Sequence, residues 1–287
     1  MQIAKVGVVG CGLMGAGIAE VCARAGYRTR VREVDDGLLS KGLARLRASL
    51  AKAVERGKLS QEGMDEALER ISGTIDLADF RDCDIVIEAA IEKMEEKRQI
   101  FSTLDAVCPP HSILASNTSS LPVVEMAAAT KRPDRVVGLH FFNPAPVMKL
   151  VELVQTITAS DETIATARSF AESLGKTVIL AKDTPGFVVN LLLVPYLLDA
   201  VRALEKGVAS REDIDQGMVL GCGHPMGPLA LLDMVGIDTC YYIANIMFDE
   251  FKEARYAPPP LMRRMVMAGH CGRKTGKGFY DYSKQER

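Results

Sequence analysis

The sequence contains no run of eighteen or more uninterrupted apolar residues, although 48% of its 287 residues are hydrophobic. A transmembrane helix needs such a run, so we expect no membrane span. The formal net charge of −2 gives no sign of a nucleic-acid-binding face. Residues 3–9 already form an apolar, strand-like segment, which leaves no room for a secretory signal peptide. These absences favour a globular protein of the cytoplasm.

The seven cysteines are odd in number and scattered, with no CxxC pair and no accompanying cluster of histidines. Disulfide scaffolds and zinc sites need paired or closely spaced ligands, so we expect neither, and no bound metal. Reduced thiols fit a cytosolic setting. We interpret Cys11, which lies inside a glycine-rich stretch, as a small residue rather than a nucleophile.

Two patterns divide the chain and predict about two domains. Up to residue 183, strand-like runs alternate with helical ones, which is typical of a doubly wound parallel sheet with helices on both faces. From 184 to 287 only helical patterns remain, so we expect an α/β domain over 1–183 and an all-α domain over 184–287. The expected strands are 3–9, 27–34, 83–89, 112–116, 136–141, 150–156 and 176–180; the expected helices are 16–25, 94–106, 121–129, 162–174, 186–203, 209–220, 229–251 and 260–268.

A GxGxxG motif, residues 10–15 (GCGLMG), lies between the first strand and the first helix. Gly10 allows a tight turn, Gly12 lets backbone N–H groups approach a pyrophosphate, and Gly15 lets the helix pack closely on the strand. The helix N-terminus offers unpaired N–H donors to the phosphates. We therefore expect this segment, with Leu13 and Met14, to bind a dinucleotide on a Rossmann-like sheet. The alternative is a glycine-rich turn without a ligand.

An acidic residue, Glu33, lies near the end of the second expected strand, eighteen residues after Gly15. A carboxylate at this point accepts hydrogen bonds from the ribose diol and repels a 2′-phosphate, so it favours NAD over NADP. Arg30 and Arg32 weaken the inference, because a nearby arginine can receive a phosphate.

The most informative stretch is residues 140–144 (HFFNP), followed by Glu152. His140 ends one apolar run, and two prolines break the chain before a second run at 150–154. If the runs pair, His140 meets Glu152, and an imidazole oriented by a carboxylate is a suitable general base near neutral pH. The alternative is a histidine satisfied by a backbone partner. Residues 117–120 (NTSS) also follow a strand, so they can face the same crevice at the carboxyl ends of the strands.

Two regions outside the sheet have open interpretations. A helical hairpin over residues 36–72 carries Arg56 and Lys58, which lie either on a solvated surface or in a clamp for a phosphorylated substrate. The all-helical domain has more apolar residues, as at 191–198, than a bundle of its size easily hides, which favours a symmetric dimer. Asn190 is either structural or able to fix a substrate oxygen beside His140.

Taken together, the motifs resemble the L-3-hydroxyacyl-CoA dehydrogenase family over essentially the whole chain. The size is similar to that of the short, single-function bacterial members. The motifs that carry the resemblance are residues 10–15, 116–120 (SNTSS), 140–144, 183–190 (DTPGFVVN), 224–229 (HPMGPL), 233–236 (DMVG) and 273–280 (RKTGKGFY).

The resemblance implies reversible oxidation of (S)-3-hydroxyacyl-CoA to 3-oxoacyl-CoA with NAD, on short chains such as 3-hydroxybutyryl-CoA, in β-oxidation and butanoate metabolism. It implies that His140 is the general base, that Glu152 holds and charge-balances it, and that Ser119 and Asn190 hydrogen-bond the substrate oxygen. It also implies a homodimer formed through the C-terminal domain. The implied cofactor contacts are Gly10, Gly12, Leu13, Met14, Gly15, Glu33, Glu92, Lys97, Asn143 and Lys274; Ser49 and Arg56 match CoA-contacting positions, which favours a clamp that includes Lys58.

Two residues depart from the family pattern. Glu33 stands where many members carry Asp, and its extra methylene should still reach a ribose. Leu191 stands where members usually carry Arg, which puts the anchoring of the first C-terminal helix and the assembly in doubt.

Two other functions stay open at this point. The first is a dehydrogenase of a free hydroxy acid or sugar acid, and the doubled Phe141-Phe142 resembles the acyl-CoA branch more than that one. The second is a non-catalytic dinucleotide-binding protein. Such a protein has no need of the full polar set, Ser119, His140, Glu152 and Asn190.

Overall fold

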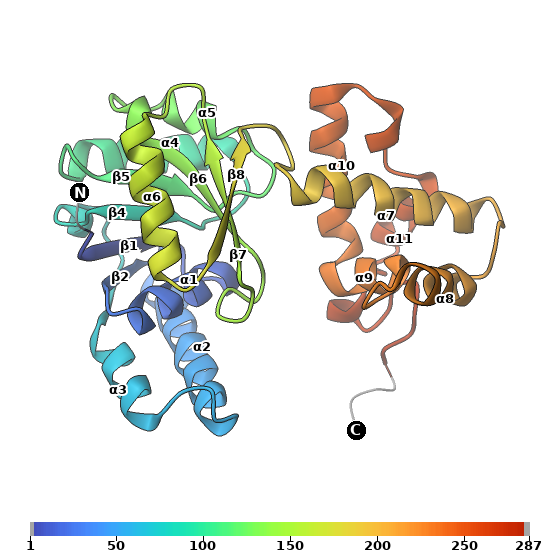
Figure 1. Cartoon of the computed structure of the whole chain (residues 1–287), viewed down its shortest axis with the longest axis horizontal. Coiled ribbons are helices and arrows are strands. Elements are labelled where there is room, and N and C mark those ends of the chain that lie inside the picture. Colours follow the sequence, from blue (N-terminus) through green and yellow to red (C-terminus); the bar gives the residue numbers. More distant parts are fainter. Residues whose placement is uncertain (1–2, 284–287) are drawn as a thin grey trace. The chain divides into compact units, whose positions relative to one another are not determined.

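The computed structural model describes residues 3–283. Contacts within the chain divide it into two compact units, one ending at Thr184 and the other beginning at Pro185 (Figure 1). The first unit contains a sheet and the helices that cover it, and the second is built from helices.

The N-terminal unit is organised by one sheet. Its strands are β1 (Lys5–Val9), β2 (Arg28–Arg32), β3 (Ile71–Thr74), β4 (Ile85–Glu88), β5 (Ile113–Ser116), β6 (Val136–Phe141), β7 (Leu150–Gln155) and β8 (Thr177–Lys182). They lie in the order β3-β2-β1-β4-β5-β6-β7-β8, and every neighbouring pair is parallel except β6 with β7. The expected doubly wound, mostly parallel sheet is confirmed. Because β1, β4, β5 and β6 are consecutive neighbours, the residues that follow them share one edge of the sheet.

Helices cover both faces of this sheet. Alternate strand residues, such as Val6 and Val8, join a core with α1 (Leu13–Arg24) and α6 (Asp161–Ser173). On the opposite face, α5 (Val123–Ala127) packs near Gly138 of β6. The remaining helical elements of the unit are α2 (Asp36–Glu55), α3 (Gln61–Glu69), η1 (Leu77–Phe80), α4 (Met94–Val107) and η2 (Pro133–Arg135).

The helical hairpin forms as expected, but it ends earlier than residue 72. Asp35 and Ser60 cap α2 and α3, each accepting a hydrogen bond from a first-turn backbone N–H. Ile71, expected inside the hairpin, instead begins β3, which pairs with β2 from Thr29 to Arg32. Tertiary pairing with β2 decides the structure of this four-residue segment, which has little periodicity of its own.

The C-terminal unit is all-helical in its regular structure. It contains α7 (Val189–Glu205), α8 (Arg211–Cys222), α9 (Pro228–Val235), α10 (Ile237–Phe251), η3 (Ala254–Tyr256), α11 (Pro260–Met267) and η4 (Arg273–Thr275). The single helix expected over 229–251 is wrong, because Gly236 has φ +104° and separates α9 from α10. Among the described residues, no single helix is long and apolar enough to span a membrane; only α9 and α10 together pass, across a 95° bend.

Two buried aspartates hold the C-terminal unit together. Asp215 of α8 accepts hydrogen bonds from the Leu229 and Ala230 N–H groups and so caps α9. Asp233 of α9 accepts from the Phe279 and Tyr280 N–H groups at 2.9 and 2.8 Å. Burial raises the pKa of the Asp233 carboxyl despite these bonds. The 224–229 and 273–280 motifs therefore brace α9.

Substituting Gly278 should destabilise the C-terminal unit. A Cβ at this residue would lie 2.0 Å from Asp233 Oδ1, so Gly278→Ala is expected to cost about 1–3 kcal/mol, as overpacking typically does. The matched control is Gly221→Ala in α8, where a Cβ meets no described heavy atom within 4 Å and alanine favours the helix by up to about 1 kcal/mol. Thermal unfolding of both variants measures the difference. Equal Tm values would contradict the role given to the Asp233 pocket.

Candidate functional site

The glycine-rich turn connects β1 to α1 and is shaped for a ligand. Gly10 has φ +93°, and a Cβ there would lie 2.7 Å from the Ala89 carbonyl oxygen. A Cβ on Gly15 would lie 1.9 Å from the Gly10 carbonyl oxygen. At Gly12, in contrast, no described heavy atom comes within 4 Å of that position. Two glycines are thus required by the fold, whereas Gly12 keeps space above the turn, which fits a dinucleotide pyrophosphate.

Glu33 folds back onto this turn. Its Oε1 accepts a 2.6 Å hydrogen bond from the Cys11 N–H, and its Oε2 accepts one from the Val34 N–H at 3.1 Å. The carboxylate is therefore held beside the glycine-rich turn, at the end of β2. In dinucleotide-binding sheets a carboxylate at this position accepts hydrogen bonds from the ribose diol. The two arginines of β2 are directed elsewhere. Arg30 pairs with Asp82 at 2.9 Å, and Arg32 Nε donates to the Ile75 carbonyl.

Arg45 of α2 also contacts the turn, a contact that the sequence did not indicate. Its guanidinium donates to the Cys11 carbonyl at 3.2 Å. The helix approaches so closely because Gly42 faces the turn, where a Cβ would lie 2.4 Å from Cys11 Sγ. The sequence feature that could have indicated this contact is the spacing of Gly42 and Arg45, which are three residues apart and therefore share one face of the helix.

Cys11 itself is chemically quiet. Burial, with the nearby Glu33 charge, raises the pKa of the Cys11 thiol to about 11. The thiolate is the reactive form, so we expect Cys11 to stay unmodified when the native protein is treated with iodoacetamide near pH 8. The exposed Cys222 should be alkylated under the same conditions. Peptide mass spectrometry measures both; rapid labelling of Cys11 would contradict its interpretation as a small residue.

His140 and Glu152 face each other across the one antiparallel pair of the sheet. They are register partners in β6 and β7, and His140 Nδ1 lies 2.7 Å from Glu152 Oε2. His140 is 6% exposed and Glu152 is fully buried. A carboxylate accepts, so Nδ1 donates, and Nε2 is the ring nitrogen suited to take up a proton. The Phe142 ring packs 4.6 Å from the imidazole centroid. The expected strand pairing and its contact are confirmed.

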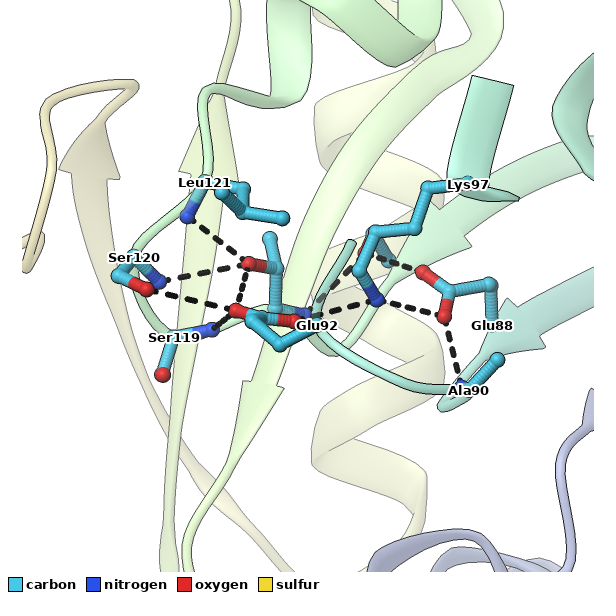
Figure 2. A network of polar contacts seen from close by, with 9 residues as sticks. Glu88, Ala90, Glu92, Lys97, Ser119, Ser120 and Leu121 are labelled. Carbon is cyan, nitrogen blue, oxygen red and sulfur yellow. Dashed lines mark hydrogen bonds and ion pairs between the residues drawn. The ribbon is translucent and has the colours of Figure 1, made fainter. Parts of the chain in front are cut away.

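The loop after β5 is fixed to its neighbours by side chains. Asn117 Oδ1 accepts a 2.9 Å hydrogen bond from the Phe141 N–H, which ties the loop to the strand that carries His140. Glu92 Oε1 accepts from the Ser119 N–H at 3.2 Å. In Figure 2 the Ser119 hydroxyl points away from Glu92. Ser119 thus presents its side chain at the edge of the sheet next to the end of β6.

Lys97 is buried, and its ammonium group is paired with two carboxylates. It is 1% exposed, and its ammonium lies 2.6 Å from Glu88 and 3.2 Å from Glu92 (Figure 2). The sequence suggested Glu92 and Lys97 as cofactor contacts. The structure adds that they form one ionic cluster with Glu88, a residue that the sequence did not single out.

The other candidate residues lie on loops, helix ends and the C-terminal unit. Asn143 is exposed, in a connection whose Ala145 and Met148 carbonyls accept hydrogen bonds from Lys176 Nζ at 2.6 and 2.8 Å. Ser49 is half-buried on α2, and Arg56 and Lys58 are exposed at and after its end. Asn190 is the second residue of α7, and Lys274 forms a 2.7 Å ion pair with Asp238.

The structure therefore gathers three groups of candidates within the N-terminal unit: the turn with Glu33, the Glu92–Lys97–Ser119 cluster, and the His140–Glu152 pair. Glu33 lies at the end of β2 and the turn at the end of β1, so the edge at which sheets of this type bind ligands continues from there over β4 and β5 to β6. Among residues 3–283, no three His, Cys, Asp or Glu side chains gather as a metal site would need.

Comparison with known proteins gives a match over nearly the whole chain. Residues 5–184 match the family model described as 3-hydroxyacyl-CoA dehydrogenase, NAD binding domain, and residues 186–282 match the one described as 3-hydroxyacyl-CoA dehydrogenase, C-terminal domain. The chain is 52% identical to a 3-hydroxybutyryl-CoA dehydrogenase of Mycobacterium tuberculosis, over 98% of this chain and 99% of that one. It is 46% identical to a probable 3-hydroxybutyryl-CoA dehydrogenase of Bacillus subtilis, over 99% of both chains.

Similarity extends to solved structures. The crystal structure of (S)-3-hydroxybutyryl-CoA dehydrogenase from Ralstonia eutropha superposes with a TM-score of 0.95 at 45% identity, covering 99% of this chain and 100% of that one. The Ralstonia eutropha enzyme thus has the same two-unit architecture.

Proposed function

Because the chain belongs to the L-3-hydroxyacyl-CoA dehydrogenase family, we propose that it oxidises (S)-3-hydroxyacyl-CoA reversibly to 3-oxoacyl-CoA, with short acyl chains such as 3-hydroxybutyryl as its substrates. It is an NAD-dependent oxidoreductase. The observation that carries the assignment of the chemistry is the buried His140–Glu152 pair, 2.7 Å apart, at the carboxyl end of β6.

The proton leaves the substrate through His140. Nε2 accepts the proton of the 3-hydroxyl group, and Glu152, at Nδ1, stabilises the imidazolium that results. When bound, NAD would supply the acceptor for the hydride from carbon 3, which carries this hydroxyl group. Ser119 and Asn190 donate hydrogen bonds to the substrate oxygen and hold it in line with the base. The buried position of His140 keeps bulk water from competing for the proton.

The cofactor is held by the N-terminal unit. The backbone of residues 10–15, with Leu13 and Met14 opening α1, meets the pyrophosphate, and Glu33 accepts from the adenosine ribose. Arg30 and Arg32 are engaged with Asp82 and Ile75, which supports a preference for NAD over NADP. Glu92, Asn143 and, from the C-terminal unit, Lys274 complete the proposed contacts to the dinucleotide, and the buried Lys97 supports them through its ion pair with Glu92.

The CoA group is bound by the helical hairpin. Arg56 and Lys58 are exposed at and after the end of α2, the helix that carries Ser49. We expect the double variant Arg56→Ala with Lys58→Ala to raise KM for acetoacetyl-CoA about tenfold or more, since even one lost charge-assisted hydrogen bond is worth about 1.5–3 kcal/mol. KM for acetoacetyl-N-acetylcysteamine, which lacks the nucleotide, should not change.

The matched control is Arg81→Ala. Arg81 is exposed and precedes β4, at the edge of the sheet opposite the ligand-binding edge. The same loss with both thioesters would indicate that the arginine and lysine do not contact CoA.

The activity is tested by the rate of NADH oxidation with acetoacetyl-CoA, beside NADPH and beside free acetoacetate. Turnover only with NADH and the thioester supports the proposal. Comparable rates with free acetoacetate would favour a dehydrogenase of free hydroxy acids. Tight NADH binding without turnover of either substrate would leave the non-catalytic alternative.

A homodimer formed through the C-terminal unit and a cytoplasmic location complete the proposal, with roles in β-oxidation and butanoate metabolism. Large apolar side chains on this unit are exposed in the single chain, among them Leu192, Leu220, Tyr242 and Met267. Exposed large apolar side chains of this kind become buried when a subunit interface forms. Light scattering after size-exclusion chromatography measures the assembly; a monomeric mass would contradict it.

A further inference from the structure

Glu88, the last residue of β4, is a fully buried carboxylate with three hydrogen-bond donors. Its Oε1 accepts from the Ala90 N–H at 2.7 Å and from Lys97 Nζ at 2.6 Å, and its Oε2 accepts from Ser116 Oγ at 2.6 Å (Figure 2 shows the first two). Since no part of Glu88 is exposed, it cannot touch a substrate or cofactor. Its three partners come from the loop after β4, from α4 and from β5.

Two chains of hydrogen bonds, one of which includes the Lys97–Glu92 ion pair, lead from Glu88 to the loop that carries Ser119. The first passes through Lys97 to Glu92, whose Oε1 accepts from Thr118 Oγ1 and from the Ser119 N–H. The second passes through Ser116, whose Oγ accepts from the Thr118 N–H at 3.2 Å. Both chains end on the backbone of residues 118–121, so Glu88 is the point at which the supports of this loop converge.

The charges in this cluster are poorly explained by stability alone. Burying Lys97 and Glu88 together carries a desolvation penalty that often cancels the attraction between them. The pair joins β4 to α4, and β4 is already held in register with β5, with Ile85 opposite Ile113 and Glu88 opposite Ser116. An apolar pair would join the strand and the helix as well. What an ionic cluster adds is a fixed direction for each hydrogen bond, and here that direction is toward the loop of Ser119.

We propose that Glu88 is a positioning residue for the reaction: through Lys97, Glu92 and Ser116 it holds the 118–121 loop so that the Ser119 hydroxyl meets the substrate oxygen beside His140. This inference rests on the proposed function, because it takes Ser119 to contact the substrate. It gives Glu88 a role in turnover without contact to either reactant.

The test is a double-mutant cycle between Glu88→Gln and Ser119→Ala, with kcat for acetoacetyl-CoA reduction as the readout. Glutamine keeps the size of Glu88 but loses the charge that holds Lys97. If Glu88 acts through Ser119, we expect Glu88→Gln to lower kcat about tenfold in the otherwise unchanged enzyme, the scale of one misplaced hydrogen bond of about 1.4 kcal/mol. In the Ser119→Ala background it should have little further effect.

Equal losses in both backgrounds would overturn the inference, because Glu88 would then act independently of Ser119. If Ser119→Ala turns over normally, both this inference and the role of Ser119 fail, while NADH-dependent turnover itself still supports the proposed function. Should Glu88→Gln not fold, Ser116→Ala cuts one of the two chains and is tested in the same cycle.

The matched control is Glu20→Gln. Glu20 is also a buried carboxylate of the N-terminal unit, on α1, ion-paired with Arg24 at 3.3 Å. No hydrogen bond from Glu20 leads to the 118–121 loop among the described contacts. We expect this variant to alter Tm without the coupling to Ser119. Coupling of similar size at Glu20 would show that the cycle reports general loss of stability.

Discussion

Replacing His140 with glutamine is expected to lower kcat by about 10²- to 10⁴-fold, the range that general-base catalysis supplies, while NADH affinity stays nearly unchanged. Glutamine can keep a hydrogen bond to Glu152 but cannot accept the substrate proton at neutral pH. His140 lies at the end of β6, whereas the turn and Glu33 that hold the cofactor belong to β1 and β2. Steady-state rates with acetoacetyl-CoA and fluorescence titration with NADH measure the two quantities separately.

His111→Gln is the control for this prediction. His111 is exposed, and its Nε2 lies 3.3 Å from Asp84 at the opposite end of the strands, so its loss should leave turnover intact. A parallel loss of NADH affinity in His140→Gln would show that His140 serves the cofactor and not the proton transfer.

Substitution by alanine should leave the stability of the free protein unchanged at Gly12 and lower it at Gly15. Gly12→Ala places a methyl group in open space, at φ −66°, so Tm should not change. With the dinucleotide bound, the same methyl group occupies the place of the pyrophosphate. We expect NADH affinity to fall about 10- to 100-fold, since the loss of one charge-assisted hydrogen bond costs about 1.5–3 kcal/mol.

Gly15→Ala should lower Tm as well as affinity. Its Cβ would lie 1.9 Å from the Gly10 carbonyl oxygen, so the turn itself must shift. Thermal unfolding without NADH and titration with NADH separate the two cases. Unchanged NADH affinity in Gly12→Ala would mean that the turn does not bind the cofactor, whatever happens in Gly15→Ala.

The sequence predicts the local structure well where glycines and prolines mark the ends of strands and helices. A glycine motif between a strand and a helix predicts a turn, because few other residues adopt the φ of Gly10. Two apolar runs separated by prolines predict adjacent antiparallel strands, and the face-to-face placement of His140 and Glu152 follows from period two.

The remainder depends on distant pairing that no local pattern encodes. Glu88 lies in an apolar run and looks like the end of a strand. Only the approach of α4 and β5 makes it the acceptor for Lys97 and Ser116. Likewise, residues 71–74 form a strand because their backbone pairs with the outer side of β2. The break at Gly236 was missed because one glycine inside an apolar stretch also occurs within continuous helices.

The antiparallel pairing of β6 with β7 limits how sequences of this type can change in length. A single residue inserted or deleted within either strand would send one member of the His140–Glu152 pair to the other face of the sheet. A change of two residues would restore the face but separate the pair by about 6–7 Å along the strand. Insertions and deletions compatible with proton transfer are therefore confined to the connection, residues 142–149, while within the two strands only substitution remains.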